Sequence, residues 1–186
     1  MRRLLYPLLF SALFAFVSCS KWHPDPTPPA KDELPAITQE GKMTIGCLLN
    51  DTVLIPKGYT GRSNPSIHYD PTNLGGELSI TMYHIDQTDS VRQYLIIGGS
   101  NINKTGTYDV SSPAGDVGIQ YSKVFKKTNS GCEYHFSEPG CTQLGKLTII
   151  RLDLTQKIIA GTFSFALTRS GCDTVRFSQG RFDLKF

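Results

Sequence analysis

Residues 158–167, IIAGTFSFAL, decide the fold class of this chain. In this stretch Phe163, Phe165 and Leu167 alternate with small or polar residues, which is the period of a β-strand with one buried face. The same alternation recurs in ELSITMY (77–83) and in RFDLKF (181–186). From residue 38 onward no window keeps a helical period for more than two turns. The sequence therefore predicts a single all-β domain over residues 38–186.

Turn residues separate these apolar runs. Asn50-Asp51 and Thr155-Gln156 each lie between two strand-like runs and suit hairpins, and Gly98-Gly99 ends a third run. We also expect a turn at Gln179-Gly180. These turns predict about eight to ten short strands, arranged as an antiparallel β-sandwich or a partly closed β-barrel.

The last strand places three large apolar side chains on one face. Phe182, Leu184 and Phe186 alternate there with Arg181, Asp183 and Lys185. We expect the apolar set to pack in the core, and Arg181 and Asp183 to meet solvent.

The first residues, MRRLLYPLLFSALFAFVSC (1–19), have the charged start and short apolar run of a secretory signal. The run over residues 4–17 is too short for a transmembrane helix, which needs about 20 residues. Its end, Ser18-Cys19, resembles the lipobox of bacterial lipoproteins. This resemblance implies that residues 1–18 are a signal peptide, that Cys19 is lipidated, and that the protein is anchored in the outer membrane. It does not distinguish the periplasmic face from the cell surface.

The next segment, residues 19–37, is rich in proline, as in PDPTPP (24–29). Closely spaced prolines prevent a helix or a central strand and keep the chain extended, so we predict a tether ahead of the domain. The chain has 19 Lys+Arg and 16 Asp+Glu, and the signal carries two of the basic residues. The remaining balance, near neutrality, disfavours a nucleic-acid partner.

Three stretches, LPAITQEGK (34–42), IGCLLN (45–50), and GTFSF (161–165) with GRFD (180–183), are similar to a family of uncharacterised lipoproteins from gut Bacteroidota. In that family the chain runs from a lipobox through a first hairpin, here TQEGKMTIGCLLN, to a closing GRFD strand. The resemblance therefore covers nearly all of the chain. It implies architectural motifs and no enzymatic activity.

The domain contains four cysteines besides Cys19, an even number in an oxidising compartment, so we predict two disulfides. Three pairings are open. One of them bonds Cys132 to Cys141 around a turn at residues 138–140, and then bonds Cys47 to Cys172. No pair has the short spacing typical of structural zinc, so we predict no metal site and no cofactor.

Motifs of hydrolases and nucleotide-binding proteins are absent from the sequence. Two pairs, His84 with Asp86 and His68 with Asp70, have the spacing of one strand face and could serve as acid and base. Solvated surface residues explain the same pattern, so catalysis is the less favoured interpretation. Tyr59, Tyr69 and Trp22 are weak candidates for stacking on a sugar.

Three triplets of the form Asp-Ser/Thr-aliphatic begin at residues 51, 89 and 173. They resemble the acceptor of Bacteroidota O-glycosylation, which implies modification at Thr52, Ser90 and Thr174. An aspartate turn that leads into a strand produces the same triplet, so both interpretations stay open.

Together these features predict a lipid-anchored envelope protein whose domain is a non-catalytic ligand-binding or interaction module. A glycan or another envelope protein is the expected partner. The alternative is an envelope hydrolase or a protein inhibitor on the same scaffold. A concave pocket that gathers His84, Asp86 and a nucleophile would favour the enzyme.

Overall fold

The computed structural model describes residues 32–85, 91–111, 115–125 and 130–186. Residues 32–186 form one compact unit. Residues 1–31, which contain the predicted signal sequence, Cys19, Trp22 and most of the predicted tether, lie outside the described residues, as do Asp86 and Ser90.

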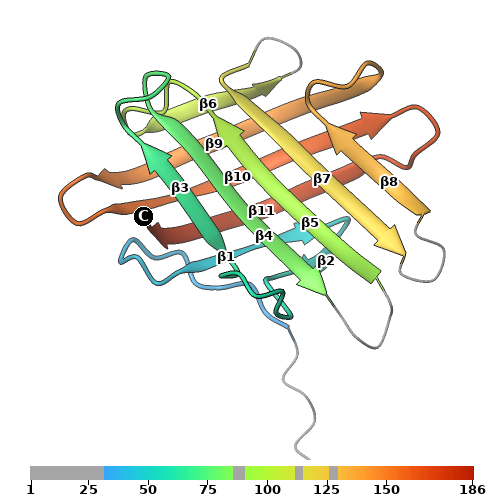
Figure 1. The fold of residues 1–186 in the computed structure, drawn as a ribbon, viewed down its shortest axis with the longest axis horizontal. Helices are drawn as coiled ribbons and strands as arrows, with labels where there is room; N and C mark the ends of the chain where they lie inside the picture. The colour runs from blue at the N-terminus through green and yellow to red at the C-terminus, as the bar shows by residue number, and fades with distance from the viewer. Residues whose placement is uncertain (1–31, 86–90, 112–114, 126–129) are drawn as a thin grey trace, which may run out of the picture. The chain divides into compact units, whose positions relative to one another are not determined.

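The described residues form eleven strands, which confirms the all-β prediction (Figure 1). In chain order they are β1 (Thr44–Leu49), β2 (Thr52–Leu54), β3 (Ser66–Asp70), β4 (Glu77–Ile85), β5 (Val91–Gly99), β6 (Gly106–Ser111), β7 (Val117–Phe125), β8 (Ser130–His135), β9 (Cys141–Asp153), β10 (Ile158–Arg169) and β11 (Val175–Lys185). Three of them, β3, β6 and β8, were not predicted. Each has few apolar residues, so its alternation is too weak to detect.

The strands follow one path, β2-β1-β11-β10-β9-β6-β7-β5-β4-β3, with β8 added on β7. All neighbours on it are antiparallel except β6 and β7, which meet at the parallel pair Val110–Val117. Figure 1 shows that the path folds into two crossing layers. The front layer consists of β3, β4, β5, β7 and β8, and the rear layer consists of β1, β2, β6, β9, β10 and β11. The path does not close into a barrel, so the arrangement is a β-sandwich.

The core lies between the layers and contains the residues that the alternation predicted. Leu78, Ile80 and Met82 of β4 are buried, as are Phe163, Phe165 and Leu167 of β10, and Phe182 and Leu184 of β11. The ring of Phe165 contacts Phe177, whose ring meets Tyr121 of the front layer edge-on, with centroids 5.2 Å apart. These rings join the two layers.

A buried glutamine joins the layers where β6 and β7 meet. Gln143 of β9 is fully buried, and its Oε1 accepts a hydrogen bond from the N–H of Ile119 at 2.9 Å. Its Nε2 donates to the carbonyl oxygen of the same residue. The amide thus takes the place of a neighbouring strand, because both main-chain groups of Ile119 would otherwise be buried without a partner.

The predicted hairpin at Asn50-Asp51 is present, and both residues have positive φ, 45° and 65°. The predicted turn at Gln179-Gly180 is wrong. β11 runs on through both residues with a β-bulge, because Phe163 pairs with Gly180 and Phe165 already pairs with Phe177. A Cβ on Gly180 would lie 2.3 Å from the ring of Phe163, so glycine lets that ring pack against the main chain.

Asp183 corrects a second expectation, since its exposed fraction is only 1%. Its carboxylate accepts hydrogen bonds from Thr38 Oγ1 at 2.6 Å and from the main-chain N–H groups of Glu40 and Gly41 at 2.9 and 2.6 Å. Burial opposes ionisation, but these hydrogen bonds outweigh it and lower the pKa of Asp183. Residues 38–42, which we call the strap, are therefore held on the last strand.

Arg181 also differs from the expectation, because it is half-buried. Its guanidinium donates to Pro35 O at 3.5 Å and to Gln179 O at 3.0 Å. From β9, Arg151 donates to Gln39 O at 2.5 Å, which fixes the strap at a second point.

Candidate functional site

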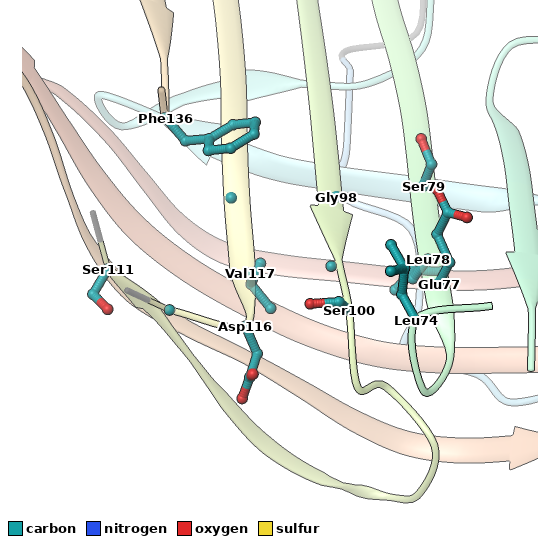
Figure 2. Close-up of a pocket in the computed structure, with 13 residues that line it drawn as sticks. Leu74, Glu77, Leu78, Ser79, Gly98, Ser100, Ser111, Asp116, Val117 and Phe136 are labelled. Atoms are coloured by element: carbon teal, nitrogen blue, oxygen red, sulfur yellow. The ribbon is translucent and has the colours of Figure 1, made fainter. Parts of the chain in front are cut away.

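A row of very small residues crosses three strands of the front layer. Ser79 of β4 pairs with Gly98 of β5, which pairs with Gly118 of β7. The row faces away from the core. Leu78 and Val117, which directly precede Ser79 and Gly118 in the chain, are buried, and successive residues of a strand face opposite sides of the sheet. A pocket of about 320 Å³ lies over this row, and we call it the glycine pocket (Figure 2).

The pocket has one aromatic wall. Figure 2 shows the ring of Phe136 beside β7. A Cβ on Gly118 would lie 2.7 Å from Phe136 Cγ, so this ring rests on the main chain of Gly118. The Phe136 ring also stacks on His135, with centroids 4.7 Å apart, and it is 49% exposed. It therefore presents an apolar surface to whatever lies in the pocket.

Two carboxylates and three hydroxyls are the polar side-chain groups of the lining, which also includes the exposed side chain of Leu74. Glu77 Oε2 accepts a hydrogen bond from Asn73 Nδ2 at 2.5 Å, and Asp116 Oδ1 accepts one from Asn101 Nδ2 at 3.3 Å. The hydroxyls belong to Ser79, Ser100 and Ser111.

The loops that carry the two asparagines support each other. The N–H of Asn101 donates to Leu74 O at 2.9 Å, and the N–H of Ile102 donates to Gly76 O at 3.0 Å. A Cβ on Gly76 would lie 2.4 Å from Ile102 O, so only glycine allows this close approach. The rim of the pocket is thus preorganised by main-chain hydrogen bonds.

This lining is better suited to binding a ligand than to catalysing a reaction. Among the described residues around the pocket there is no histidine, cysteine or lysine. Its groups are an exposed ring, hydroxyls that donate and accept hydrogen bonds, and carboxylates that accept them.

The proposed acid and base residues lie elsewhere. The Nδ1 atom of His84 is 2.9 Å from Ile55 O, so this histidine fastens the segment after β2 to β4. His68 is exposed on β3. Asp70 accepts hydrogen bonds from the hydroxyl and the N–H of Thr72, at 2.7 and 2.8 Å, and these lower its pKa. None of these residues lines the glycine pocket, and Asp86 lies outside the described residues.

Of the tyrosines suggested for stacking, Tyr69 is buried, and its hydroxyl donates to Ile102 O at 2.7 Å. Tyr59 is exposed but lies outside the pocket. The sequence reasoning did not identify Phe136. A detectable signal was Gly98-Gly99, because glycine inside a strand often marks a close approach of another group.

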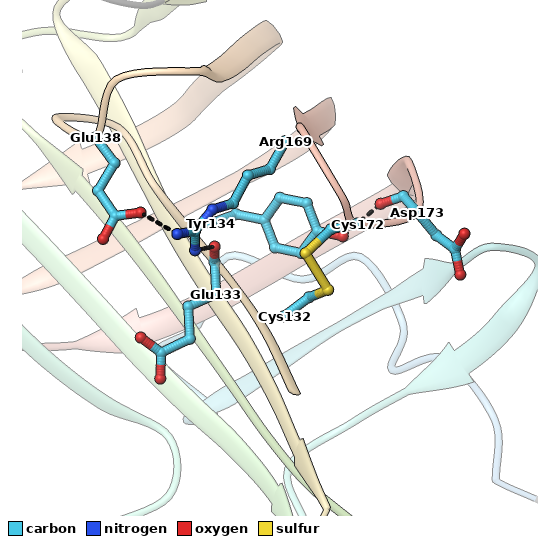
Figure 3. Close-up of a disulfide and its surroundings, with 7 residues drawn as sticks. All are labelled: Cys132, Glu133, Tyr134, Glu138, Arg169, Cys172 and Asp173. Carbon is cyan, nitrogen blue, oxygen red and sulfur yellow. Dashed lines mark hydrogen bonds and ion pairs between the residues drawn. A yellow bond between two sulfur atoms is a disulfide. The ribbon is translucent and has the colours of Figure 1, made fainter. Parts of the chain in front are cut away.

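The cysteines do not form the pairing described above, Cys132 with Cys141 and Cys47 with Cys172. Cys132 of β8 is bonded to Cys172, with Cα atoms 5.9 Å apart (Figure 3). Cys132 and Cys141 do not pair, because β8 is hydrogen-bonded to β7 and β9 to β10 and β6, so the two strands are not neighbours. The turn between them is a crossover rather than a hairpin.

Cys47 and Cys141 are buried free thiols, so the prediction of two disulfides is wrong for these residues. Burial raises the pKa of Cys47 to about 12. A thiol with such a pKa is not a nucleophile at neutral pH.

Two of the three O-glycosylation candidates can be placed. Thr52 begins β2 and Thr174 precedes β11, and both are exposed. They lie at one end of the domain, because the N–H of Asn50 donates to Arg176 O at 2.9 Å. Ser90 lies outside the described residues.

No protein-family model, curated protein or solved structure matches this chain. Within the described residues no helix has the length and hydropathy that a membrane crossing requires.

Proposed function

We propose that this protein is a lipid-anchored module of the bacterial outer membrane that binds a glycan in the glycine pocket without catalysing a reaction. The observation that carries the proposal is the combination of an exposed aromatic wall, two carboxylates and three hydroxyls over a glycine floor. The volume, about 320 Å³, is at the lower end of small-molecule sites, which begin at roughly 300 Å³.

A sugar ring fits this chemistry on two counts. Its C–H face is apolar and can lie against the exposed ring of Phe136, and its hydroxyls can donate to Glu77 and Asp116. Glycine at 98 lowers the floor, so that a sugar ring can approach the main chain of β5 beside the Phe136 ring, which covers Gly118.

The alternative, an envelope hydrolase, has one observation in its favour, because Glu77 and Asp116 line the same pocket. Glycoside hydrolysis needs one carboxyl group held protonated and another ionised, which requires two contrasting environments. Here each carboxylate accepts a hydrogen bond from an asparagine, Glu77 is half-buried and Asp116 is exposed. Neither carboxyl group is buried among apolar side chains, and this favours binding over catalysis.

Anchoring is supported by the lipobox-like end of the signal sequence and the proline-rich segment that follows. A tether of this composition would hold the domain away from the membrane surface.

The test uses Gly98→Val. The nearest heavy atoms to a Cβ at this position are 3.8 and 3.9 Å away, and valine suits a strand, so the variant should fold normally while its side chain fills the pocket. The purified protein is screened on an array of bacterial and host glycans, and the affinity of each hit is measured by calorimetry.

We expect Gly98→Val to abolish glycan binding without changing the Tm. The control is Ser122→Val, on β7 of the same layer but outside the pocket, which should bind the glycan normally. Equal binding by wild type and Gly98→Val would place the glycan elsewhere. Shortened glycan products after incubation would favour the hydrolase.

A further inference from the structure

A second pocket, of about 220 Å³, lies between the two layers at one end of the sandwich. The front layer contributes the end of β7 and part of β8, and the rear layer contributes the β1–β2 turn and the start of β11. Tyr121 and Tyr134 form its floor, and Leu49 and Val175 form the facing wall. We call it the sheet-end pocket.

The residue pattern of β7 changes at this pocket. Val117, Ile119 and Tyr121 are buried on the inner face, and the same face continues with Lys123 and Phe125. Lys123 is exposed and Phe125 is 44% exposed. The Lys123 Nζ atom lies 5.5 Å from the centroid of the Phe125 ring. The ammonium of Lys123 and the ring of Phe125 therefore lie at the mouth of the sheet-end pocket. If the core continued to this end of β7, buried aliphatic side chains would be expected at these two positions.

The walls are fixed by covalent and polar links between the layers. The disulfide from Cys132 ties β8 to the segment before β11, and the Tyr134 hydroxyl donates to Asp173 O (Figure 3). Arg169 of β10 donates to Glu133 O and pairs with Glu138 at 3.1 Å. A pocket held in this way loses little conformational entropy when a ligand enters.

The floor offers no free hydrogen-bonding group, because both tyrosines are only 1% exposed and both hydroxyls already have partners. The Tyr121 hydroxyl already donates to Gln93 Oε1 at 2.7 Å, and that of Tyr134 is bound to Asp173 O. Burial raises the pKa of both phenols, so they stay neutral and do not repel an anion. The carboxylate of Asp173 points away from Tyr134 (Figure 3). Of the described lining residues, Lys123 is the one with a positive charge.

We propose that the sheet-end pocket binds a small aromatic carboxylate, with its ring against Leu49 and Phe125 and its carboxylate at the Lys123 ammonium. The size agrees, since an apolar cavity of about 150 Å³ accommodates benzene, and this pocket leaves room for a short acidic side chain. The site is separate from the glycine pocket and shares no lining residue with it.

The probe is 3-phenylpropanoate, and its uncharged counterpart is 3-phenylpropan-1-ol. Each is titrated at millimolar concentration into the purified full-length protein while the methyl NMR signals of Leu49 and Val175 are followed. We expect both probes to shift these signals and the carboxylate to bind more tightly.

Lys123→Gln keeps most of the side chain and removes the charge. This variant should lower the affinity for 3-phenylpropanoate about fivefold, since a partly exposed ion pair contributes at most about that factor. The affinity for 3-phenylpropan-1-ol should stay the same. Lys146→Gln, an exposed lysine on β9 outside the pocket, and Gly98→Val should change neither affinity. Equal affinities of the two probes in the wild type, or unshifted methyl signals, would overturn the proposal. So would equal losses in the Lys123 and Lys146 variants.

Discussion

Asp183→Asn is expected to loosen the strap and destabilise the whole domain. The native carboxylate accepts hydrogen bonds through both oxygens, from Thr38 and Glu40 at Oδ2 and from Gly41 at Oδ1, and the N–H of Lys42 donates to it as well. An amide has one oxygen, so its NH2 group must face at least one of these donors. One bond to a charged acceptor is then lost, at about 1.5–3 kcal/mol, and the bonds that remain are weaker.

We therefore expect a loss of about 3 kcal/mol in the free energy of unfolding. For a domain of this size that corresponds to a fall in Tm of about 6–12 °C. The matched control is Asp109→Asn, since Asp109 is exposed on β6 and should cost less than about 0.5 kcal/mol.

The variant should also change the pH dependence of stability. The pKa of Asp183 is lower in the folded state than in the unfolded state, where it is near 3.9. Its stabilising contribution is therefore complete above the unfolded value and is lost as the pH falls through the lower folded value. Asp183→Asn lacks this contribution at every pH, so the difference from wild type should shrink in acid.

Calorimetry gives the stability, and hydrogen exchange of the Glu40 and Gly41 amides reports on the strap. Both amides should exchange faster in Asp183→Asn and at wild-type rates in Asp109→Asn. Unchanged exchange, together with equal Tm values for the two variants, would show that the buried carboxylate does not hold the strap.

Three further outcomes are expected. In a Cys19→Ala chain, thiol titration without reductant should find no reactive group in the native protein and two after unfolding, Cys47 and Cys141; none after unfolding would mean a second disulfide. Gln143→Leu should lower the free energy of unfolding by about 2–6 kcal/mol, because it leaves the buried N–H and C=O of Ile119 without hydrogen-bond partners. Denaturant titration measures this free energy. A loss below about 1 kcal/mol would show that another group bonds to the N–H and C=O of Ile119. Cys19→Ala should release the protein from membranes and abolish its labelling with palmitate, whereas a variant that keeps the label would contradict lipidation at this residue.

Part of the candidate site could be predicted from the sequence and part could not. Gly98-Gly99 was visible as a break in an apolar run, but its placement opposite Ser79 and Gly118 depends on the register of three strands. Phe136 follows β8, a strand too short and too polar to be detected. Its position over Gly118 could therefore not be inferred from neighbours in the sequence.

Sequence analysis alone was sufficient to predict the all-β class, the buried faces of β4, β10 and β11, and the hairpin at Asn50-Asp51. Alternation of side chains and the φ preference of a turn are local properties, so they can be read from adjacent residues. The folded arrangement of the strands was needed to establish that Cys132 bonds to Cys172 and that Asp183 is buried under the strap. These contacts join segments far apart in the chain, and they form because the crossing of the two layers brings those segments together. The period of a strand gives the face on which a residue lies, but the partner that it meets depends on the strand order and register of the folded sheet.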